Sequence, residues 1–162
     1  MNIRPAGSDD VEFLRSMLYE AAKWNPDWPR EPIDKVLADP SLSHYINGWG
    51  REGDAGVIAE RDDERLGAAW YRLFTEEDPG FGFIAEDIPE LAIAVHPMYR
   101  RLGIGERLLQ SLVDRAREDG FKAVSLSVAV YNRSRMLYER NGFEKVAEIG
   151  DSWTMRLDLA SA

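Results

Sequence analysis

Residues 90–105 read ELAIAVHPMYRRLGIG. The run Glu90–Val95 is apolar after its first residue, which predicts a buried strand, and His96-Pro97 ends that strand. Two glycines, Gly103 and Gly105, then open the clearest amphipathic helix pattern of the chain. This stretch therefore predicts a strand, a glycine loop and a helix in direct succession.

The glycine loop is typical of a phosphate site. The first amide groups of a helix have no partner within the helix and carry partial positive charge, so they attract anions. Arg100 and Arg101 add positive charge, while Gly103 and Gly105 let an anion approach the backbone. The spacing excludes a dinucleotide fingerprint, which needs a third glycine where Leu108 stands, and a P-loop, which needs lysine after its last glycine. A plain surface turn before a helix is the alternative.

Helix and strand signals alternate along the rest of the chain. Residues 103–119 carry one apolar stripe with Gly120 as the stop, and residues 123–128 form an apolar strand, so a parallel strand–helix–strand unit is expected. Asp9 is expected to cap the first helix in a capping box with Glu12. The fold class is α/β, with a mixed sheet and helices on its faces. Further strands are expected at 1–5, 54–60, 66–75, 144–149 and 153–159, a turn at 61–65, and helices at 9–24, 32–37, 41–47 and 134–140.

Composition narrows the functional class. The chain has 162 residues, about the size of one domain, and no cysteine, which excludes disulfides, thiolate metal sites and cysteine nucleophiles. A net charge of -9 argues against a nucleic-acid partner. No apolar run approaches the roughly 20 residues of a membrane span, and the first residues lack the apolar core of a signal peptide. We therefore expect a single domain over residues 1–162, a cytoplasmic location, and no metal, nucleic-acid or membrane partner.

Two motifs together resemble the GNAT superfamily of N-acetyltransferases. The first is the strand and Pro97 followed by Arg-x-x-Gly-x-Gly, here at residues 100–105. The second has the family pattern Asn-x-Ala-x-x-Leu-Tyr-Glu-x-x-Gly-Phe, and residues 132–143 read NRSRMLYERNGF, with Ser134 in place of the usual alanine. Both motifs occur in the family's order and at its usual separation, and they cover residues 90–143.

This resemblance implies a fold, a co-substrate and a reaction. The fold is a mixed, mostly antiparallel sheet of about seven strands flanked by helices, with a central strand–helix–strand unit that binds acetyl-CoA. The reaction is transfer of the acetyl group to a primary amine of a small molecule or peptide by direct attack. A non-catalytic acyl-CoA-binding sensor module is the alternative function. The oligomeric state stays open, with a homodimer among the alternatives.

The resemblance also implies roles in co-substrate binding. Amide groups of the loop hold the pyrophosphate, the backbone of the preceding strand pairs with the pantetheine arm, and the N–H of Val95 stabilises the oxyanion. Asn132 matches the family asparagine near the arm, with a helix N-cap as the alternative or additional role. The expected residues share these two motifs: Ile93, Ala94, Val95, Arg100, Arg101, Leu102, Gly103, Ile104, Gly105, Glu106 and Asn132.

Glu90 and Tyr138 are the expected catalytic residues. An amine attacks a thioester only when neutral, and a lysine-type amine with a pKa of about 10.4 arrives protonated. Glu90 opens the central strand, where the family often places its base; water, a backbone carbonyl, or a merely solvated strand-end charge are the alternatives. Tyr138 matches the family's general acid, with a packed core aromatic as the alternative. His96 is expected to be structural.

The acceptor is expected to be a small cationic amine. The chain is acidic, and Glu86 and Asp87 flank strands that should frame the acceptor. Trp24, Trp28 and Trp49 lie in the N-terminal third, where exposed indoles line a pocket or attract an ammonium group. A small local core for the tryptophans, and mere solubility for the acidic residues, are the alternatives.

Overall fold

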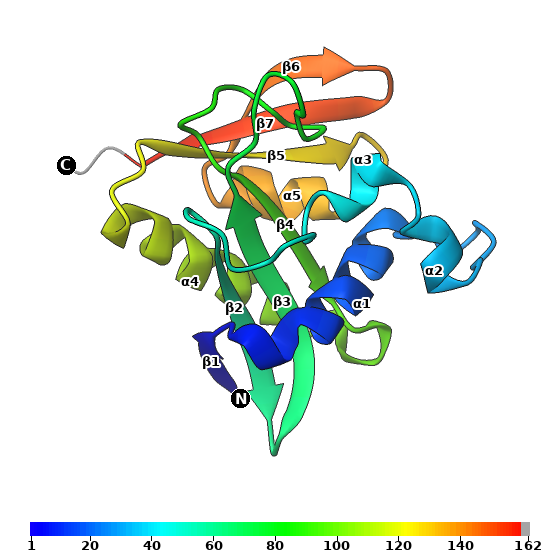
Figure 1. The fold of residues 1–162 in the computed structure, drawn as a ribbon. Helices are drawn as coiled ribbons and strands as arrows, with labels where there is room; N and C mark the ends of the chain where they lie inside the picture. The colour runs from blue at the N-terminus through cyan, green and yellow to red at the C-terminus, as the bar shows by residue number, and fades with distance from the viewer. Residues whose placement is uncertain (160–162) are drawn as a thin grey trace. The chain divides into compact units, whose positions relative to one another are not determined.

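The computed structural model describes residues 1–159 and contains one seven-stranded sheet in the order β1-β2-β3-β4-β5-β7-β6 (Figure 1). Strand β4 pairs with β5 in parallel, while β1·β2, β2·β3, β5·β7 and β6·β7 are antiparallel. The predicted α/β fold with a mostly antiparallel mixed sheet is confirmed. The strands are β1 Asn2–Pro5, β2 Ala55–Arg61, β3 Glu64–Arg72, β4 Glu90–Val95, β5 Ala123–Ala129, β6 Glu144–Ile149 and β7 Ser152–Asp158; the helices are α1 Val11–Ala22, α2 Ile33–Val36, α3 Pro40–Ser43, α4 Ile104–Glu118 and α5 Ser134–Arg140.

The chain forms two compact units. The first contains residues 1–71 and 92–112, and the second contains residues 72–91 and those from 113 onward. Strand β4 begins in the second unit and continues into the first. No helix within residues 1–159 is both long enough and apolar enough to cross a membrane.

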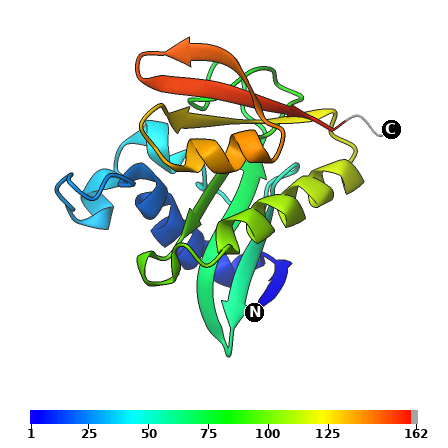
Figure 2. The ribbon, with the colours of Figure 1, turned by 180° about the vertical axis from the view of Figure 1, so that it is seen from behind.

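In the first unit, α1 and α4 lie on opposite faces of β2 and β3 (Figures 1 and 2). The apolar stripe of α4 is buried, because Leu108, Leu109 and Leu112 have no exposed surface. Gly67 of β3 permits the close approach of its neighbours: a Cβ there would lie 2.9 Å from the carbonyl oxygen of Ala94 and 3.1 Å from Leu108 Cδ1. The start of α4 and the end of β4 are therefore packed tightly on β3.

Asp10 fixes the start of α1. Its buried carboxylate accepts hydrogen bonds from Arg4 at 2.8 and 2.9 Å and from the amide of Gly7 at 2.7 Å, and it forms an ion pair with Arg65 at 3.0 Å. The hydrogen bonds from Arg4 are the main reason that the pKa of Asp10 falls to about 2. The predicted capping box at Asp9 is wrong: Gly7 stands at the N-cap of a 3-10 turn, Ser8–Asp10, and Asp10 reaches back to it.

In the second unit, α5 covers one face of β5 and β7, and the loop between β3 and β4 lies over the other (Figures 1 and 2). The loop touches β5 closely, since a Cβ on Gly82 would lie 2.5 Å from the carbonyl carbon of Leu126. Only a glycine fits at this position. Strand β6 forms the edge of the sheet and is exposed along its whole length.

Several element ends differ from the sequence prediction, among them that of α3, which ends at Ser43 rather than at residue 47. The turn between β2 and β3 contains only Asp62 and Asp63, both with positive φ (52° and 65°), because Arg61 already pairs with Glu64. Such two-residue turns match the twist of a hairpin. Strand β3 ends at Arg72 rather than at residue 75, and α1 ends at Ala22, before the tryptophans.

We predict that Asp10→Asn destabilises the protein and weakens the pH dependence of its stability. Folding lowers the pKa of Asp10 from 3.8 to about 2, so the ionised carboxylate stabilises the folded state above pH 4, and this stabilisation is lost as the pH falls toward 2. The shift corresponds to roughly 2 kcal/mol. Urea unfolding of the wild type should show this loss between pH 5 and pH 2.

The Asp10→Asn variant should lose about 2 to 4 kcal/mol at pH 7, because Arg4 and Arg65 lose a buried partner. Its stability should fall less steeply with acid. Asp9→Asn is the matched control, since Asp9 is exposed, and should change the free energy of unfolding by under about 0.5 kcal/mol. Equal stability of Asp10→Asn and wild type at pH 7 would show that this ion-pair cluster does not fix the helix start.

Candidate active site

The loop from β4 to α4 has the backbone geometry of an anion site. After β4, the Nδ1 atom of His96 accepts a hydrogen bond from the amide of Met98 at 3.2 Å and caps a 3-10 turn, Pro97–Tyr99, so His96 has a structural role as predicted. Arg101 and Gly103 then adopt left-handed conformations with φ of 67° and 78°. Left-handed residues before a helix are typical of loops whose amides converge on an anion.

The backbone at the start of α4 is open to a ligand. The helix begins at Ile104, so the amides of its first turn have no acceptor one turn earlier in the helix. A Cβ on Gly103 would meet no atom within 4 Å, and the neighbouring Leu102 is 65% exposed. This open, positively polarised helix start fits a phosphate or pyrophosphate group.

The two arginines of the loop differ in their contacts. The side chain of Arg100 donates from Nε to the carbonyl oxygen of Val95 at 3.2 Å, and its Nη2 lies 3.5 Å from Oε1 of Glu20. Arg101 is exposed, and its guanidinium makes no ion pair or hydrogen bond within residues 1–159. The sequence treats these arginines as equivalent, but in the structure Arg100 contacts Val95 and Glu20, whereas Arg101 makes no such contact; phosphate binding by either side chain stays a prediction.

Tyr138 lies on α5, with its ring packed in the core and its hydroxyl without a hydrogen bond to the described residues. Its ring meets Phe143 edge to face with a centroid distance of 5.8 Å, and its side chain is 6% exposed. Its hydroxyl makes no hydrogen bond with the described part of the chain. Burial raises the pKa of Tyr138 above the usual value near 10, so the phenol is protonated at neutral pH and can donate a proton.

Glu90 is buried, which excludes the alternative of a solvated strand-end charge. Its side chain is 2% exposed at the start of β4, and its residue pairs with Ser125 of β5. The Ser125 Oγ atom is buried without a hydrogen-bond partner. Arg72 is the other buried charged residue in the described part of this unit. A base at Glu90 therefore reaches an acceptor amine only through an intervening group or water.

Asn132 caps the helix that carries Tyr138. Its Oδ1 atom accepts a hydrogen bond from the amide of Ser134 at 2.9 Å, at the first residue of α5. Arg133 stands at the N-cap of α5 without a side-chain hydrogen bond, so Asn132 acts one residue before the N-cap position that the sequence offered for it. Contact between the Asn132 amide nitrogen and the co-substrate stays a prediction.

The residues predicted to attract a cationic acceptor are partly engaged in other contacts. Asp87 pairs with Lys122 at 3.0 Å, and Glu86 accepts a hydrogen bond from the amide of Glu76 at 3.0 Å. Trp24 and Trp28 pack against each other, with ring centroids 5.1 Å apart and an interplanar angle of 62°. Attraction of a cationic acceptor by these residues stays a prediction. The ion pair with Lys122 partly neutralises the charge of Asp87 that the sequence suggested for this role.

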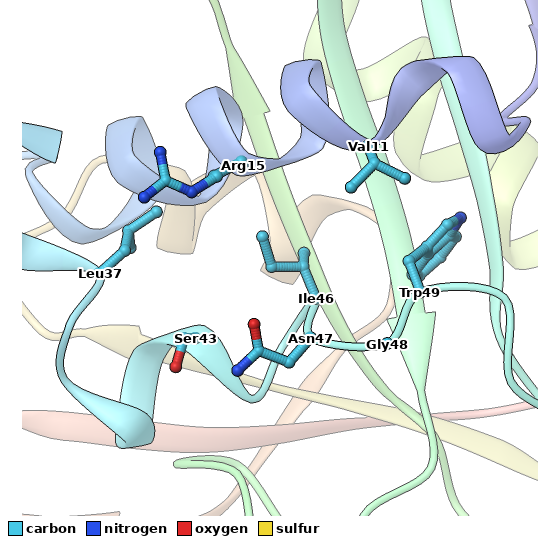
Figure 3. Close-up of a pocket in the computed structure, with 8 residues that line it drawn as sticks. All are labelled: Val11, Arg15, Leu37, Ser43, Ile46, Asn47, Gly48 and Trp49. Atoms are coloured by element: carbon cyan, nitrogen blue, oxygen red, sulfur yellow. The ribbon is translucent and has the colours of Figure 1, made fainter. Parts of the chain in front are cut away.

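The first unit also contains a cavity of about 260 Å³ between α1 and the segment before β2 (Figure 3). No acidic residue lines it, and Arg15 contributes a guanidinium whose partner is Asp34 at 2.6 Å. Trp49 is the one N-terminal tryptophan that lines it. The cavity holds none of the predicted site residues and does not fit a cationic acceptor. Its lining consists of Val11, Arg15, Leu37, Ser43, Ile46, Asn47, Gly48 and Trp49.

The sequence analysis did not single out two residues that lie beside predicted site residues: Glu20 contacts Arg100, and Ser125 pairs with Glu90. Nothing in the local pattern connects Glu20 with the glycine loop, because their contact is made only by folding. Ser125 had a recognisable signal, since a serine inside an otherwise apolar strand is a buried polar group that needs an explanation. Within the described residues, no group of three or more histidine, aspartate or glutamate side chains could hold a metal ion.

Comparison with known proteins identifies the family. A model of the acetyltransferase (GNAT) family matches residues 15–143. The chain belongs to this family. The matched residues include the glycine loop and α5.

Relatives of this GNAT chain differ in length and name. Mycothiol acetyltransferase of Pseudarthrobacter chlorophenolicus is 33% identical over 134 residues, which cover 76% of this chain but 38% of that protein. The chain thus spans about two fifths of the length of that relative. The uncharacterised N-acetyltransferase YhfO of Bacillus subtilis is also 33% identical, over 90% of this chain and 91% of its own length.

The GNAT fold is also seen in solved structures. PaiA N-acetyltransferase from Thermoplasma acidophilum, solved in complex with coenzyme A, matches with a TM-score of 0.70 and 18% identity, over 98% of this chain and 99% of that chain. At this identity the match shows the shared fold.

We predict that Asn132→Ala destabilises the protein by about 1 kcal/mol, because the first amide of α5 loses its acceptor. Asn132→Asp is the matched control: it keeps an acceptor oxygen and should retain the wild-type stability within about 0.5 kcal/mol. Urea unfolding monitored by circular dichroism measures both values. If Asn132→Ala were as stable as Asn132→Asp, the cap would not support the helix that carries Tyr138.

Proposed function

We propose that the protein is an acetyl-CoA-dependent N-acetyltransferase that transfers the acetyl group to a primary amine of a small molecule or peptide. The observation that carries this proposal is the open loop with left-handed Arg101 and Gly103 at the start of α4. Membership of the acetyltransferase family supports acetyl-CoA, rather than another phosphate compound, as the ligand of that loop. We also propose that the two units act as one acetyltransferase domain.

The chain would bind acetyl-CoA mainly through backbone groups. First-turn amides of α4, including those of Ile104 and Gly105, would hold the pyrophosphate, and Arg101 would add charge from the side. Backbone groups of Ile93–Val95 would pair with the pantetheine arm as an added strand does. Such binding depends little on side-chain identity. Glycines are important in it because they leave the backbone amides accessible to the ligand.

The chemistry then requires proton transfers before and after the attack. The ammonium group first loses a proton toward Glu90 through water, and the neutral amine nitrogen then attacks the thioester carbonyl carbon. The tetrahedral intermediate collapses with cleavage of the carbon–sulfur bond, and the nitrogen releases its second proton through water. Tyr138 would protonate the departing thiolate as the carbon–sulfur bond breaks; burial raises the pKa of Tyr138, so the phenol carries its proton when the thiolate leaves. The Val95 amide would donate to the oxyanion.

For the acceptor, we propose only a chemical class. Its chemistry is that of a primary amine, and a preference for a small cationic amine rests on the net charge of -9 alone. A non-catalytic acyl-CoA sensor is the second candidate. The unbonded Tyr138 hydroxyl favours the enzyme, because a sensor has no need of a buried proton donor. A cytoplasmic location stays a prediction.

We predict that Gly105→Val weakens CoA binding at least about tenfold, which is 1.4 kcal/mol, because a branched side chain blocks the pyrophosphate from the first-turn amides. Isothermal titration calorimetry with CoA measures the change. Gly105→Ala is the graded control and should have a smaller effect, since one methyl group obstructs less. Unchanged CoA affinity in a folded Gly105→Val variant would contradict the pyrophosphate assignment.

We predict that Tyr138→Phe lowers kcat about 100-fold and leaves KM for acetyl-CoA little changed, because the ring still packs on Phe143 while the proton donor is lost. Thiol release from acetyl-CoA in the presence of an amine panel measures the rate. A fully active Tyr138→Phe variant would remove Tyr138 from the mechanism. Wild-type protein that binds CoA yet releases no thiol with any amine would favour the sensor.

A further inference from the structure

Glu20 of α1 contacts the phosphate loop although it lies outside every motif of the sequence. Its Oε1 atom is 3.5 Å from Nη2 of Arg100. The side chain of Glu20 is 12% exposed, so this charge is largely removed from water. Arg100 is 43% exposed, so the pair lies at the protein surface with only its acidic member shielded from solvent.

Glu20 is itself held in place from its other side. Its Oε2 atom accepts a hydrogen bond from Nη2 of Arg30 at 2.6 Å, and the guanidinium of Arg30 lies over the ring of Tyr19 at 4.9 Å. Oε1 of Glu20 is buried and makes no hydrogen bond, so its contact with Arg100 is an ion pair without a hydrogen bond. Glu20 is thus a fixed anion at the end of α1.

Arg100 uses this contact to hold the loop. Its Nε atom donates to the carbonyl oxygen of Val95, the last residue of β4, at 3.2 Å. The next residue, Arg101, has a φ of 67°, a left-handed conformation that is unfavourable for any residue with a Cβ. A side chain fixed at both β4 and α1 directly before such a residue opposes relaxation of the loop.

We propose that Glu20 and Arg100 form a brace that holds the β4–α4 loop in its anion-binding conformation, and that Glu20 is a positioning residue for co-substrate binding. This inference rests on the proposed function of the loop. Arg100 then acts through its contacts with Val95 and Glu20, while Arg101 and the backbone amides meet the phosphate. A loop held in its bound conformation before binding loses less entropy on binding.

The test is the affinity of Glu20→Gln for CoA by isothermal titration calorimetry. Glutamine keeps the shape and removes the charge, so the loop relaxes and Kd should rise about fivefold. The KM for acetyl-pantetheine, which lacks the pyrophosphate, should stay within about twofold of wild type, since this substrate does not use the loop. A purely structural defect would raise both constants.

Arg30→Gln is the graded comparison, because it removes the hydrogen bond that holds Glu20 and leaves the charges of Glu20 and Arg100 in place; its Kd for CoA should lie between those of wild type and Glu20→Gln. Arg100→Gln alone should weaken CoA binding as Glu20→Gln does, and it should do so even if Glu20→Gln fails to fold, since Arg100 is 43% exposed. The double variant should bind as weakly as Arg100→Gln, because one brace is lost in each case.

Three results would overturn the brace. Unchanged affinity in Glu20→Gln, or additive losses in the double variant, would show that Glu20 and Arg100 act independently. Tighter CoA binding in Glu20→Gln would show that the freed Arg100 meets the phosphate directly. Wild-type protein without affinity for CoA would instead reject the proposed function, whereas wild-type binding with an unaffected Glu20→Gln variant would reject only the brace.

Discussion

The candidate site depends on the amides of Ile104 and Gly105 in the first turn of α4. A helix cannot bond these groups to itself, and they carry the positive end of its dipole. Most proteins satisfy them with a capping side chain or water, but here the residue before the helix is Gly103, which offers no side chain. The left-handed Arg101 and Gly103 hold the chain so that this helix start is open. This arrangement fits an anion.

The rest of the first unit supports that helix start. Gly67 lets β3 approach both Ala94 of β4 and Leu108 of α4, so strand and helix are fixed against the same neighbour. His96 closes the turn after β4, and Arg100 connects the loop to Val95 and Glu20. Precise placement matters because backbone amides cannot adjust their direction as side chains can.

The second unit carries the polar groups suited to proton transfer. Tyr138, Glu90 and Ser125 are all buried, and burial of polar groups costs free energy unless hydrogen bonds replace water. The Ser125 hydroxyl and that of Tyr138 make no hydrogen bond with the described residues. Buried polar groups of this kind concentrate at functional sites, where the partner is a substrate or an ordered water.

Local patterns in the sequence predicted the elements around the site well. The bounds of β4 and α5 were predicted correctly because Pro97 and Gly142 are strong local stop signals, and the apolar stripe of α4 marked its buried face. The helix start at Asp10 was misplaced because two strands supply the arginines that hold its carboxylate, Arg4 from the neighbouring β1 and Arg65 from the distant β3. The different contacts of Arg100 and Arg101 were hidden for the same reason.

For the candidate site residues, the sequence indicated which residues to examine but not how buried they are or what they contact. Tyr138 was named from its motif, and its burial and unbonded hydroxyl then supplied a physical reason for the role. Glu90 was named from its position, but its 2% exposure was not foreseen, because a polar residue at a strand end is usually solvated. The acceptor could not be predicted, since Trp24 and Trp28 give no spacing that fixes a pocket.

The most direct test of the account is a titration of the ¹⁵N-labelled protein with CoA, followed through backbone amide chemical shifts. If the first turn of α4 binds the pyrophosphate, the amides of residues 101–106 should show the largest shifts, because a phosphate accepts hydrogen bonds from them. Shifts centred elsewhere, with the amides of residues 101–106 unmoved at saturating CoA, would contradict it.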